Sequence, residues 1–129
     1  SGICFYDLNG NPGIHSARWA GLDKDFDFAM SKINNAIKHN KNPTYECHFI
    51  CSLSISWPDE YDVTVSGQVN GKFTWPPKGD KGFGYDPIFK PLGYDITFAE
   101  MDPIFKHKIS HRSIAFRKLI DLCFPNLSC

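Results

Sequence analysis

Apolar and polar residues alternate from Cys47 to Ser56, and this pattern constrains the fold more than any other feature of the chain. The apolar positions are Cys47, Phe49, Cys51, Leu53 and Ile55, and Ile50 is the exception on the polar side. A period of two is typical of a strand with one buried face. We therefore expect a half-buried strand over about residues 45–55.

Helix and strand patterns alternate before and around this strand. A short strand is predicted around Ile3 to Leu8, followed by a turn at Asn9 to Gly13. Asp23 or Asp25 can cap a helix that Asn40 to Pro43 ends. The apolar residues of this helix share one face: Phe26, Ala29, Met30, Ile33, Ala36 and Ile37. The pattern predicts an α/β or α+β fold.

A second strand should follow a turn at Pro58 to Glu60, with Val63, Val65 and Val69 as its apolar residues. Asn70-Gly71 is either a tight hairpin turn or a β-bulge, and the short flanking segments favour the bulge. A short buried strand is predicted at Ile88-Phe89, with a turn at Pro91 to Tyr94.

The capping patterns in the C-terminal region predict the N-termini of two helices. Asp102-Pro103 is typical of a cap followed by a first-turn proline. Ser110 is the expected N-cap of a last helix that ends before Pro125. The residues of that helix expected to be buried are Ala115, Phe116, Leu119, Ile120 and Cys123.

The length and the charge balance of the chain limit the classes of function that it can have. The 129 residues fit a single domain, 1–129. Fourteen basic residues balance fourteen acidic ones, so no overall positive field recruits nucleic acid or an anionic membrane. No stretch approaches the roughly 20 apolar residues of a membrane span, and the first residues do not resemble a signal peptide. We expect a cytoplasmic protein that does not bind nucleic acid or membranes.

Five cysteines at irregular spacing fit free thiols better than a disulfide framework. Cys47 and Cys51 do not suit a shared zinc ion, because four residues of a strand span about 13 Å and each zinc–sulfur bond is about 2.3 Å. We expect no metal site at these thiols.

The run from Gly82 to Phe89 indicates a nucleotide site. Gly82 and Gly84 let the backbone approach a ligand closely, and the rings of Phe83 and Tyr85 can offer faces to a purine. Asp86 supplies an acceptor for an N–H of the base. The region lacks the Gly-Lys-Ser/Thr ending of a Walker loop, and it lacks the third glycine of a dinucleotide fingerprint.

Lys106, His111 and Arg112 add positive charge near the start of the last helix. On their own, such residues are more often a solvated basic face. A helix N-terminus already carries about half a positive charge, so cations there do not favour the helix and instead create an anion site. Their position indicates a site for phosphate.

Several segments resemble the inosine triphosphate pyrophosphatase family. They are Ser1-Gly2, residues 11–21 (Asn-Pro-Gly-Ile-His-Ser-Ala-Arg-Trp-Ala-Gly), residues 82–89, residues 97–101 (Thr-Phe-Ala-Glu-Met), Lys106 and residues 109–112 (Ile-Ser-His-Arg). Their order and spacing agree with the family along essentially the whole chain.

The resemblance implies an α/β fold with a mixed, twisted sheet, flanking helices and two lobes around a nucleotide cleft. It also implies a homodimeric hydrolase that uses Mg²⁺ to convert ITP, dITP or XTP to the monophosphate and pyrophosphate, and so removes aberrant purines from nucleotide pools. The residues that match the family's substrate-binding positions are Ser1, Phe83, Gly84, Tyr85, Asp86, Lys106, His111 and Arg112.

The chain departs from the family at its start. Family members have a preceding segment with the first strand and helix, a phosphate loop, a magnesium-binding glutamate and a catalytic aspartate just before the serine that matches Ser1. We therefore expect a truncated domain with no catalytic or metal-ligating residue of its own. A fragment of a longer enzyme, one half of a split gene and a decayed remnant all fit this departure.

Two functions follow from these explanations. The chain is an enzyme when the missing segment is supplied in cis or by a partner chain, or it is a non-catalytic module that retains partial nucleotide binding or a dimer surface. The preference among inosine, xanthosine and other bases depends on small pocket contacts and stays open.

Overall fold

A computed structural model describes residues 1–58 and 61–125. Its sheet has the strand order β2-β1-β3-β4-β5, and each neighbouring pair is antiparallel. The predicted class, α/β with a sheet and flanking helices, is confirmed, but the described strands pair only antiparallel, where a mixed sheet was predicted. The strands are β1 (Gly2–Phe5), β2 (Pro12–Gly13), β3 (Glu46–Ser56), β4 (Asp62–Phe73) and β5 (Phe89–Pro91).

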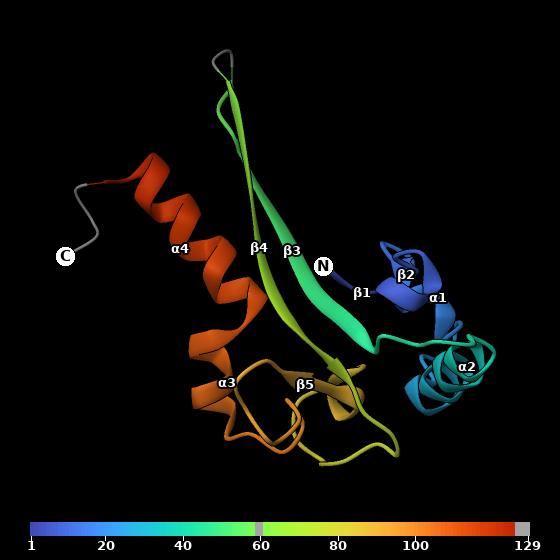
Figure 1. Ribbon diagram of the computed structural model, residues 1–129. Helices are drawn as coiled ribbons and strands as arrows, with labels where there is room; N and C mark the ends of the chain where they lie inside the picture. Colours follow the sequence, from blue (N-terminus) through green and yellow to red (C-terminus); the bar gives the residue numbers. More distant parts are fainter. Residues whose placement is uncertain (59–60, 126–129) are drawn as a thin grey trace.

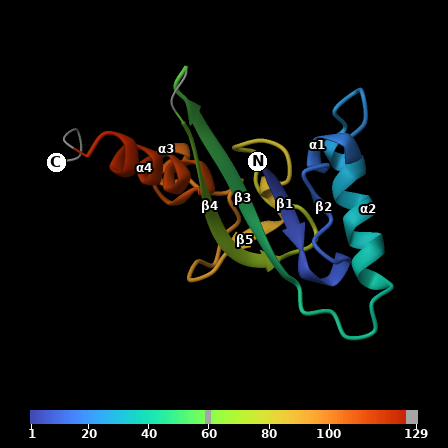
Figure 2. The ribbon, with the colours of Figure 1, turned by 90° about the horizontal axis from the view of Figure 1, so that it is seen from above.

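Helices lie on both sides of a long β3–β4 hairpin. Figure 1 shows α4 (His111–Cys123) on one side of the hairpin, while β1, β2, α1 (Ser16–Trp19) and α2 (Phe26–Lys38) lie on the other. The view from above shows the same separation (Figure 2). The remaining elements are α3 (Pro103–Ile109) and two 3₁₀ turns, η1 (Tyr6–Leu8) and η2 (Asp86–Ile88). No helix among the described residues is long and apolar enough to cross a membrane.

The helix α2 forms where its sequence pattern predicts it. The Asp25 side chain accepts a hydrogen bond from the Phe28 N–H at 3.0 Å and caps the helix. Four apolar residues of one helical face, Ala29, Met30, Ile33 and Ile37, are buried in the main core. They pack there with Ile3 and Phe5 of β1, so α2 shares its core with the β1 end of the sheet.

The first strand is shorter than predicted. β1 ends at Phe5, and Tyr6–Leu8 form a 3₁₀ turn that Asn9 closes with a left-handed backbone at φ 56°. The bond from the Gly10 N–H to the Phe5 carbonyl then turns the chain back toward β2. The tight turn explains the early end, because it takes over backbone groups that a longer strand would use.

The prediction of a hairpin turn or bulge at Asn70-Gly71 is wrong. Both residues lie inside β4, where Asn70 pairs with His48 and Gly71 pairs with Cys47 in an uninterrupted register. A side chain at Gly71 would overlap the Phe89 ring, so the glycine permits close approach of β5 rather than a turn. In the predicted turn at 58–60, Asp59 and Glu60 lie outside the described residues.

The helix α4 begins as predicted but buries fewer residues than expected. The Ser110 hydroxyl accepts a hydrogen bond from the Ser113 N–H at 3.3 Å. Ala115 and Leu119 are buried, whereas Phe116 is 57% exposed, so its predicted burial is wrong. The helix crosses β4 at Gly67, where an added Cβ would overlap the backbone of His111 and Ala115. This close crossing turns the face of His111, Ala115 and Leu119 inward and leaves Phe116 outside the contact. Ile120 and Cys123 are only partly buried.

Candidate functional site

The loop from Gly82 to Asp86 is anchored by Tyr85. The Tyr85 hydroxyl donates a hydrogen bond to the Ser16 carbonyl at 2.5 Å, and its ring meets Phe26 edge to face at 5.3 Å between centroids. Burial raises the pKa of Tyr85 to about 12. The ring is 4% exposed and offers no open face to a ligand, which corrects the expectation that both aromatic rings are open.

A buried ion pair joins this loop to α3. The Lys106 ammonium lies 2.5 Å from Asp86 Oδ2, and the side chains are 14% and 4% exposed. The same carboxylate oxygen accepts a hydrogen bond from the Phe83 N–H at 3.0 Å. Asp102 caps α3 and so orients the helix that carries Lys106. The pair fixes the loop to the helix and leaves other lone pairs of the carboxylate available.

Phe83 is the exposed aromatic residue of the loop. Its side chain is 60% exposed, and the flanking Gly82 and Gly84 have φ of 73° and 63°. The Arg112 guanidinium lies 4.7 Å from the ring centroid and the Lys106 ammonium lies 4.9 Å from it. The ring is therefore an exposed platform held beside two cations.

His111, the first residue of α4, is 6% exposed and stacks on Phe49 of β3 at 4.9 Å between centroids. Its Nδ1 atom is buried without a hydrogen-bond partner. Burial, then the nearby charges of Arg112 and Lys106, lower the pKa of His111 to about 4. The imidazole is thus neutral near pH 7 and has one unused polar atom.

This shifted pKa predicts a pH dependence of stability. The unfolded chain binds the His111 proton more readily than the folded chain, so the contribution is fully present above about pH 6.5 and is lost as the pH falls toward about 4. We expect the difference in melting temperature between the native protein and His111→Gln to shrink as the pH is lowered through this window. A difference that stays constant with pH would contradict the assignment.

The predicted binding residues, which come from distant parts of the chain, meet around one cavity of about 160 Å³. Arg112 Nη2 lies 3.5 Å from the Ser1 hydroxyl and so connects the chain start to α4. The cavity wall includes Ser1, Phe83, Gly84, Tyr85, Asp86, Lys106, His111 and Arg112. A second hollow of about 260 Å³ shares Phe83, Lys106, His111 and Arg112 with it. We call these two hollows together the site cavity.

Phe49 also lines the site cavity, and the sequence pattern identified it only as a core residue of the strand. The alternation of apolar and polar residues places Phe49 on the buried face of the strand. It does not indicate that the Phe49 ring stacks on His111. The contact joins β3 to the start of α4 and depends on the packing of distant segments.

The described residues do not fit a metal ion by themselves. They contain no group of three or more His, Cys, Asp or Glu side chains that could hold one. Asp86, the carboxylate that lines the smaller hollow, is already paired with Lys106. Magnesium usually takes carboxylates together with water and substrate phosphates, so we derive no step through a metal from these residues.

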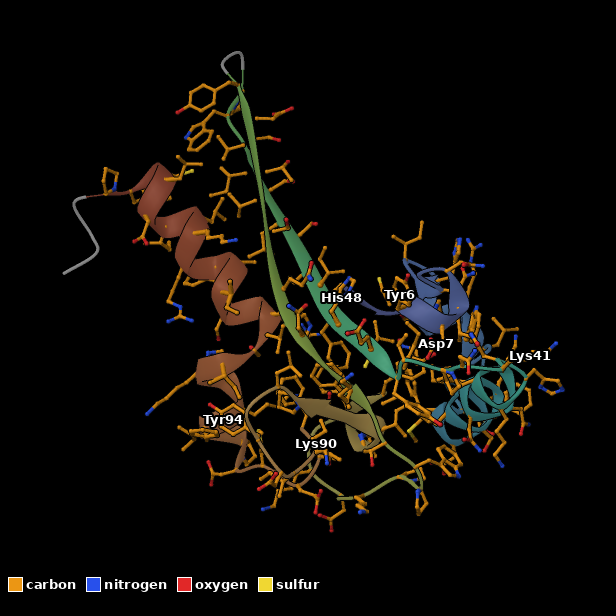
Figure 3. The ribbon with its side chains drawn as sticks, in the orientation of Figure 1. Tyr6, Asp7, Lys41, His48, Lys90 and Tyr94 are labelled. Atoms are coloured by element: carbon orange, nitrogen blue, oxygen red, sulfur yellow. The ribbon has the colours of Figure 1, made fainter. Side chains whose placement is uncertain are left out.

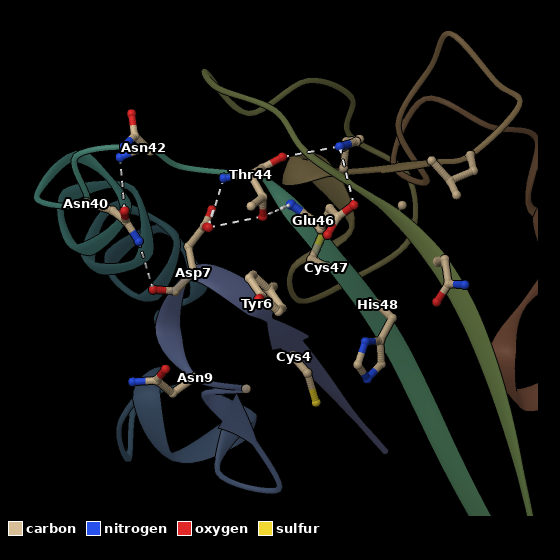
Figure 4. A pocket seen from close by; sticks show the side chains of 15 residues that line it. Cys4, Tyr6, Asp7, Asn9, Asn40, Asn42, Thr44, Glu46, Cys47 and His48 are labelled. Carbon is tan, nitrogen blue, oxygen red and sulfur yellow. Dashed lines mark hydrogen bonds and ion pairs between the residues drawn. The ribbon is translucent and has the colours of Figure 1, made fainter.

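A larger polar hollow of about 810 Å³ lies where β3 and β4 meet the turn after β1. Figure 3 shows Tyr6, Asp7 and His48 close together at this end of β3. Asp7 lines the hollow, and its carboxylate accepts bonds from Thr44 N at 2.9 Å, Thr44 Oγ1 at 3.0 Å and Tyr45 N at 2.8 Å (Figure 4). No local sequence pattern marks Asp7, because its partners are distant in the chain.

We expect Asp7→Ala to lower the free energy of unfolding by about 2 kcal/mol, since two partly buried donors and one exposed donor lose a charged acceptor. Tyr45 also has a left-handed backbone, φ 62°, that these bonds help to hold. Urea denaturation measures the change. Asp95→Ala, at an exposed position, is the control and should change stability by less than about 0.5 kcal/mol. Equal effects of the two variants would contradict the role of Asp7.

Comparison with known proteins gives a consistent family match. The model of the Ham1 family matches residues 1–122. The chain is 46% identical over 125 residues to a dITP/XTP pyrophosphatase of Rhodospirillum centenum, covering 96% of this chain and 62% of that protein. It is 45% identical over 124 residues to a dITP/XTP pyrophosphatase of Zymomonas mobilis, covering 95% and 59%.

A solved structure agrees with these sequence matches. The Ham1 protein of Staphylococcus aureus superposes with a TM-score of 0.89 at 34% identity, covering 97% of this chain and 64% of that one. The chain therefore spans about three fifths of the length of the relatives that it matches.

Proposed function

Because this chain belongs to the Ham1 family, we propose that it carries the base-recognition part of a hydrolase for aberrant purine nucleoside triphosphates. The reaction converts ITP, dITP or XTP to the monophosphate and pyrophosphate. The observation that carries the proposal is the site cavity, in which an exposed aromatic ring, a neutral buried imidazole and two cations converge. The relatives named dITP/XTP pyrophosphatase support the substrate class.

The chemistry of the site cavity favours a 6-oxo purine. Lys106 and Arg112 are donors without acceptor capacity. Inosine and xanthosine present a carbonyl at position 6, whereas adenosine presents an amino group there. A carbonyl oxygen can accept a hydrogen bond from a cationic side chain. An amino group in the same place is itself a donor, so the amino group and the cation both lack an acceptor, which costs about 1 to 3 kcal/mol. His111 Nδ1, which has no partner, can complete the contacts to the base.

The burial of the two cationic side chains suggests which part of the nucleotide each one contacts. The Lys106 side chain is 14% exposed and lies behind Phe83, so we assign it to the base. Arg112 is exposed and reaches Ser1, so we assign these two residues to the sugar and phosphate end. The N-terminus of α4 adds its partial positive charge on that side.

The magnesium and the homodimer of the proposal come from the family resemblance, and the location comes from the sequence pattern. We propose magnesium as the metal, a homodimer and a cytoplasmic location, and we assign no metal ligand and no general base to the described residues. Magnesium would lower the pKa of attacking water and neutralise phosphate charge. The described residues contribute binding and orientation of the purine.

We expect Phe83→Ala to weaken binding of inosine monophosphate by about fivefold to 150-fold, since stacking of a base on an aromatic ring contributes about 1 to 3 kcal/mol. Isothermal titration calorimetry measures this affinity. Phe28→Ala is the matched control, because Phe28 is 61% exposed on α2 and does not line the site cavity, while Phe83 is 60% exposed. Equal affinities of the two variants would contradict the stacking role.

Catalysis is tested by pyrophosphate release from inosine triphosphate with magnesium, measured on this chain and on a version extended by the N-terminal segment of a Ham1 relative. Binding by both versions with release only by the extended one supports the division of roles. Release by this chain alone would show that a described carboxylate acts in the reaction. Failure of both versions to bind inosine nucleotides would overturn the proposed function.

A further inference from the structure

Residues 11–21 resemble the family, but they contain none of the predicted binding residues. One of them, Ser16, is nevertheless 8% exposed and lines the site cavity. Its hydroxyl accepts a hydrogen bond from the Ile3 N–H at 3.0 Å and donates one to the Gly13 carbonyl at 2.6 Å. A serine hydroxyl has a single O–H, so this donor is not available to a nucleotide. The Ser16 side chain therefore borders the site and holds other parts of the chain.

The Ser16 hydroxyl fixes the start of β1. The Ile3 N–H that donates to it is two residues from Ser1, and strand pairing places Ile3 opposite Gly13. An added Cβ at Gly2 would overlap the Gly13 carbonyl and would lie 3.0 Å from Ser16 Oγ, so the strand start is seated closely against this turn. The position of Ser1 in the site cavity therefore depends on Ser16.

The backbone carbonyl of Ser16 holds the loop that carries Phe83. It accepts a hydrogen bond from the Tyr85 hydroxyl at 2.5 Å, and Tyr85 is 4% exposed. The shape of the loop itself is fixed separately by the ion pair of Asp86 with Lys106. Ser16 therefore contacts both sides of the site cavity, the chain start through its hydroxyl and the loop through its carbonyl.

The helix α1, which begins at Ser16, is itself fixed in the fold. Its last residue, Trp19, packs against the main core, and the Lys32 ammonium of α2 lies 4.5 Å from the centroid of the Trp19 ring. The next residue, Ala20, is 3% exposed. The bonds of Ser16 therefore set β1 and the loop relative to one fixed point.

We propose that Ser16 is a positioning residue that sets the spacing between the two ends of the nucleotide site. Ser1 lies at the sugar and phosphate end, and the loop of Phe83 lies at the base end. The inference rests on the proposed function, because it needs a purine nucleotide that spans the site cavity. A change of spacing weakens a ligand that contacts both ends at once and spares a ligand that contacts one end only.

Ser16→Ala removes both hydroxyl bonds and keeps the carbonyl that holds Tyr85. We expect it to weaken binding of inosine monophosphate by at least about tenfold, because small errors of position are costly when two ends must be met together. Binding of hypoxanthine, the free base of inosine, should stay within about twofold, because the base contacts one end only. Titrations followed by NMR measure both affinities on the folded protein. A residue that only stabilised the fold would leave the ratio of the two affinities unchanged.

Tyr85→Phe tests the same spacing from the other side, because it removes the hydroxyl that bonds to the Ser16 carbonyl and keeps the ring. It should also weaken the monophosphate more than the free base. The double variant should lose little more affinity than the weaker-binding single variant, since both bonds set one spacing.

Thr44→Ala is the matched control. The Thr44 hydroxyl also makes two bonds, since it donates to Asp7 Oδ1 at 3.0 Å and accepts from the Glu46 N–H at 3.1 Å. Thr44 does not line the site cavity. Its loss should lower stability and leave both affinities within about twofold, because the two sites share no partner.

The outcomes separate this inference from the proposed function. If the native protein does not bind inosine monophosphate, the proposed function is wrong. If the native protein binds but Ser16→Ala binds the monophosphate equally well, the positioning role is overturned and the proposed function stands. An equal loss of monophosphate and hypoxanthine affinity overturns it too. Where Ser16→Ala does not fold, the same comparison on Tyr85→Phe decides.

Discussion

Asp86→Ala should lower the free energy of unfolding by about 3 to 5 kcal/mol, because it removes one partner of a buried ion pair and leaves the other charge uncompensated. The Lys106 side chain is 14% exposed and its ammonium contacts the carboxylate at 2.5 Å. The variant also removes the acceptor of the Phe83 N–H. Guanidinium denaturation, analysed for midpoint and slope, measures the loss.

The double variant Asp86→Leu/Lys106→Met separates the cost of an unpaired charge from general disruption. Replacement of both members of a buried pair by apolar residues is often close to neutral. We therefore expect the double variant to be more stable than Asp86→Ala. Its inosine monophosphate affinity should nevertheless fall, because the site cavity loses both the carboxylate and a cation. A double variant less stable than Asp86→Ala would contradict the assignment of the loss to the unpaired charge.

The sequence predicted best those features that depend on near neighbours. Asp25, Asp102 and Ser110 cap helices as expected, because a cap needs only the side chain and the N–H groups of the next turn. The predicted binding residues come from short segments, and the structure brings them around one cavity.

The features that the sequence missed depend on contacts between distant segments. Asn70-Gly71 has the composition of a turn, but pairing with β3 extends the strand through it. Phe116 fits the apolar face of a helix, but the crossing at Gly67 selects a different face. The pairing of Asp86 with Lys106 and the stacking of His111 on Phe49 are likewise set by packing. No local pattern determines which of these partners a residue meets.

Gly67→Ala should lower the free energy of unfolding by about 3 kcal/mol, near the upper end for overpacking of a well-filled contact. The added Cβ would overlap the Ala115 N–H and the His111 carbonyl, which are backbone atoms and cannot rotate away. Relief requires that α4 move off β4. Because α4 begins with His111 and Arg112, we also expect weaker binding of inosine monophosphate. Chemical denaturation and calorimetry measure the two effects.

Gly93→Ala is the matched control for this change. Gly93 has φ of 88°, and an added Cβ would meet no atom within 4 Å. It therefore tests backbone strain without overpacking and should cost about 1 to 2 kcal/mol. It should leave nucleotide affinity unchanged, because Gly93 does not line the site cavity. If Gly67→Ala lost stability but kept full affinity, the position of α4 on β4 would not control the site, and the base contacts would have to come from the loop of Phe83 and from α3 alone.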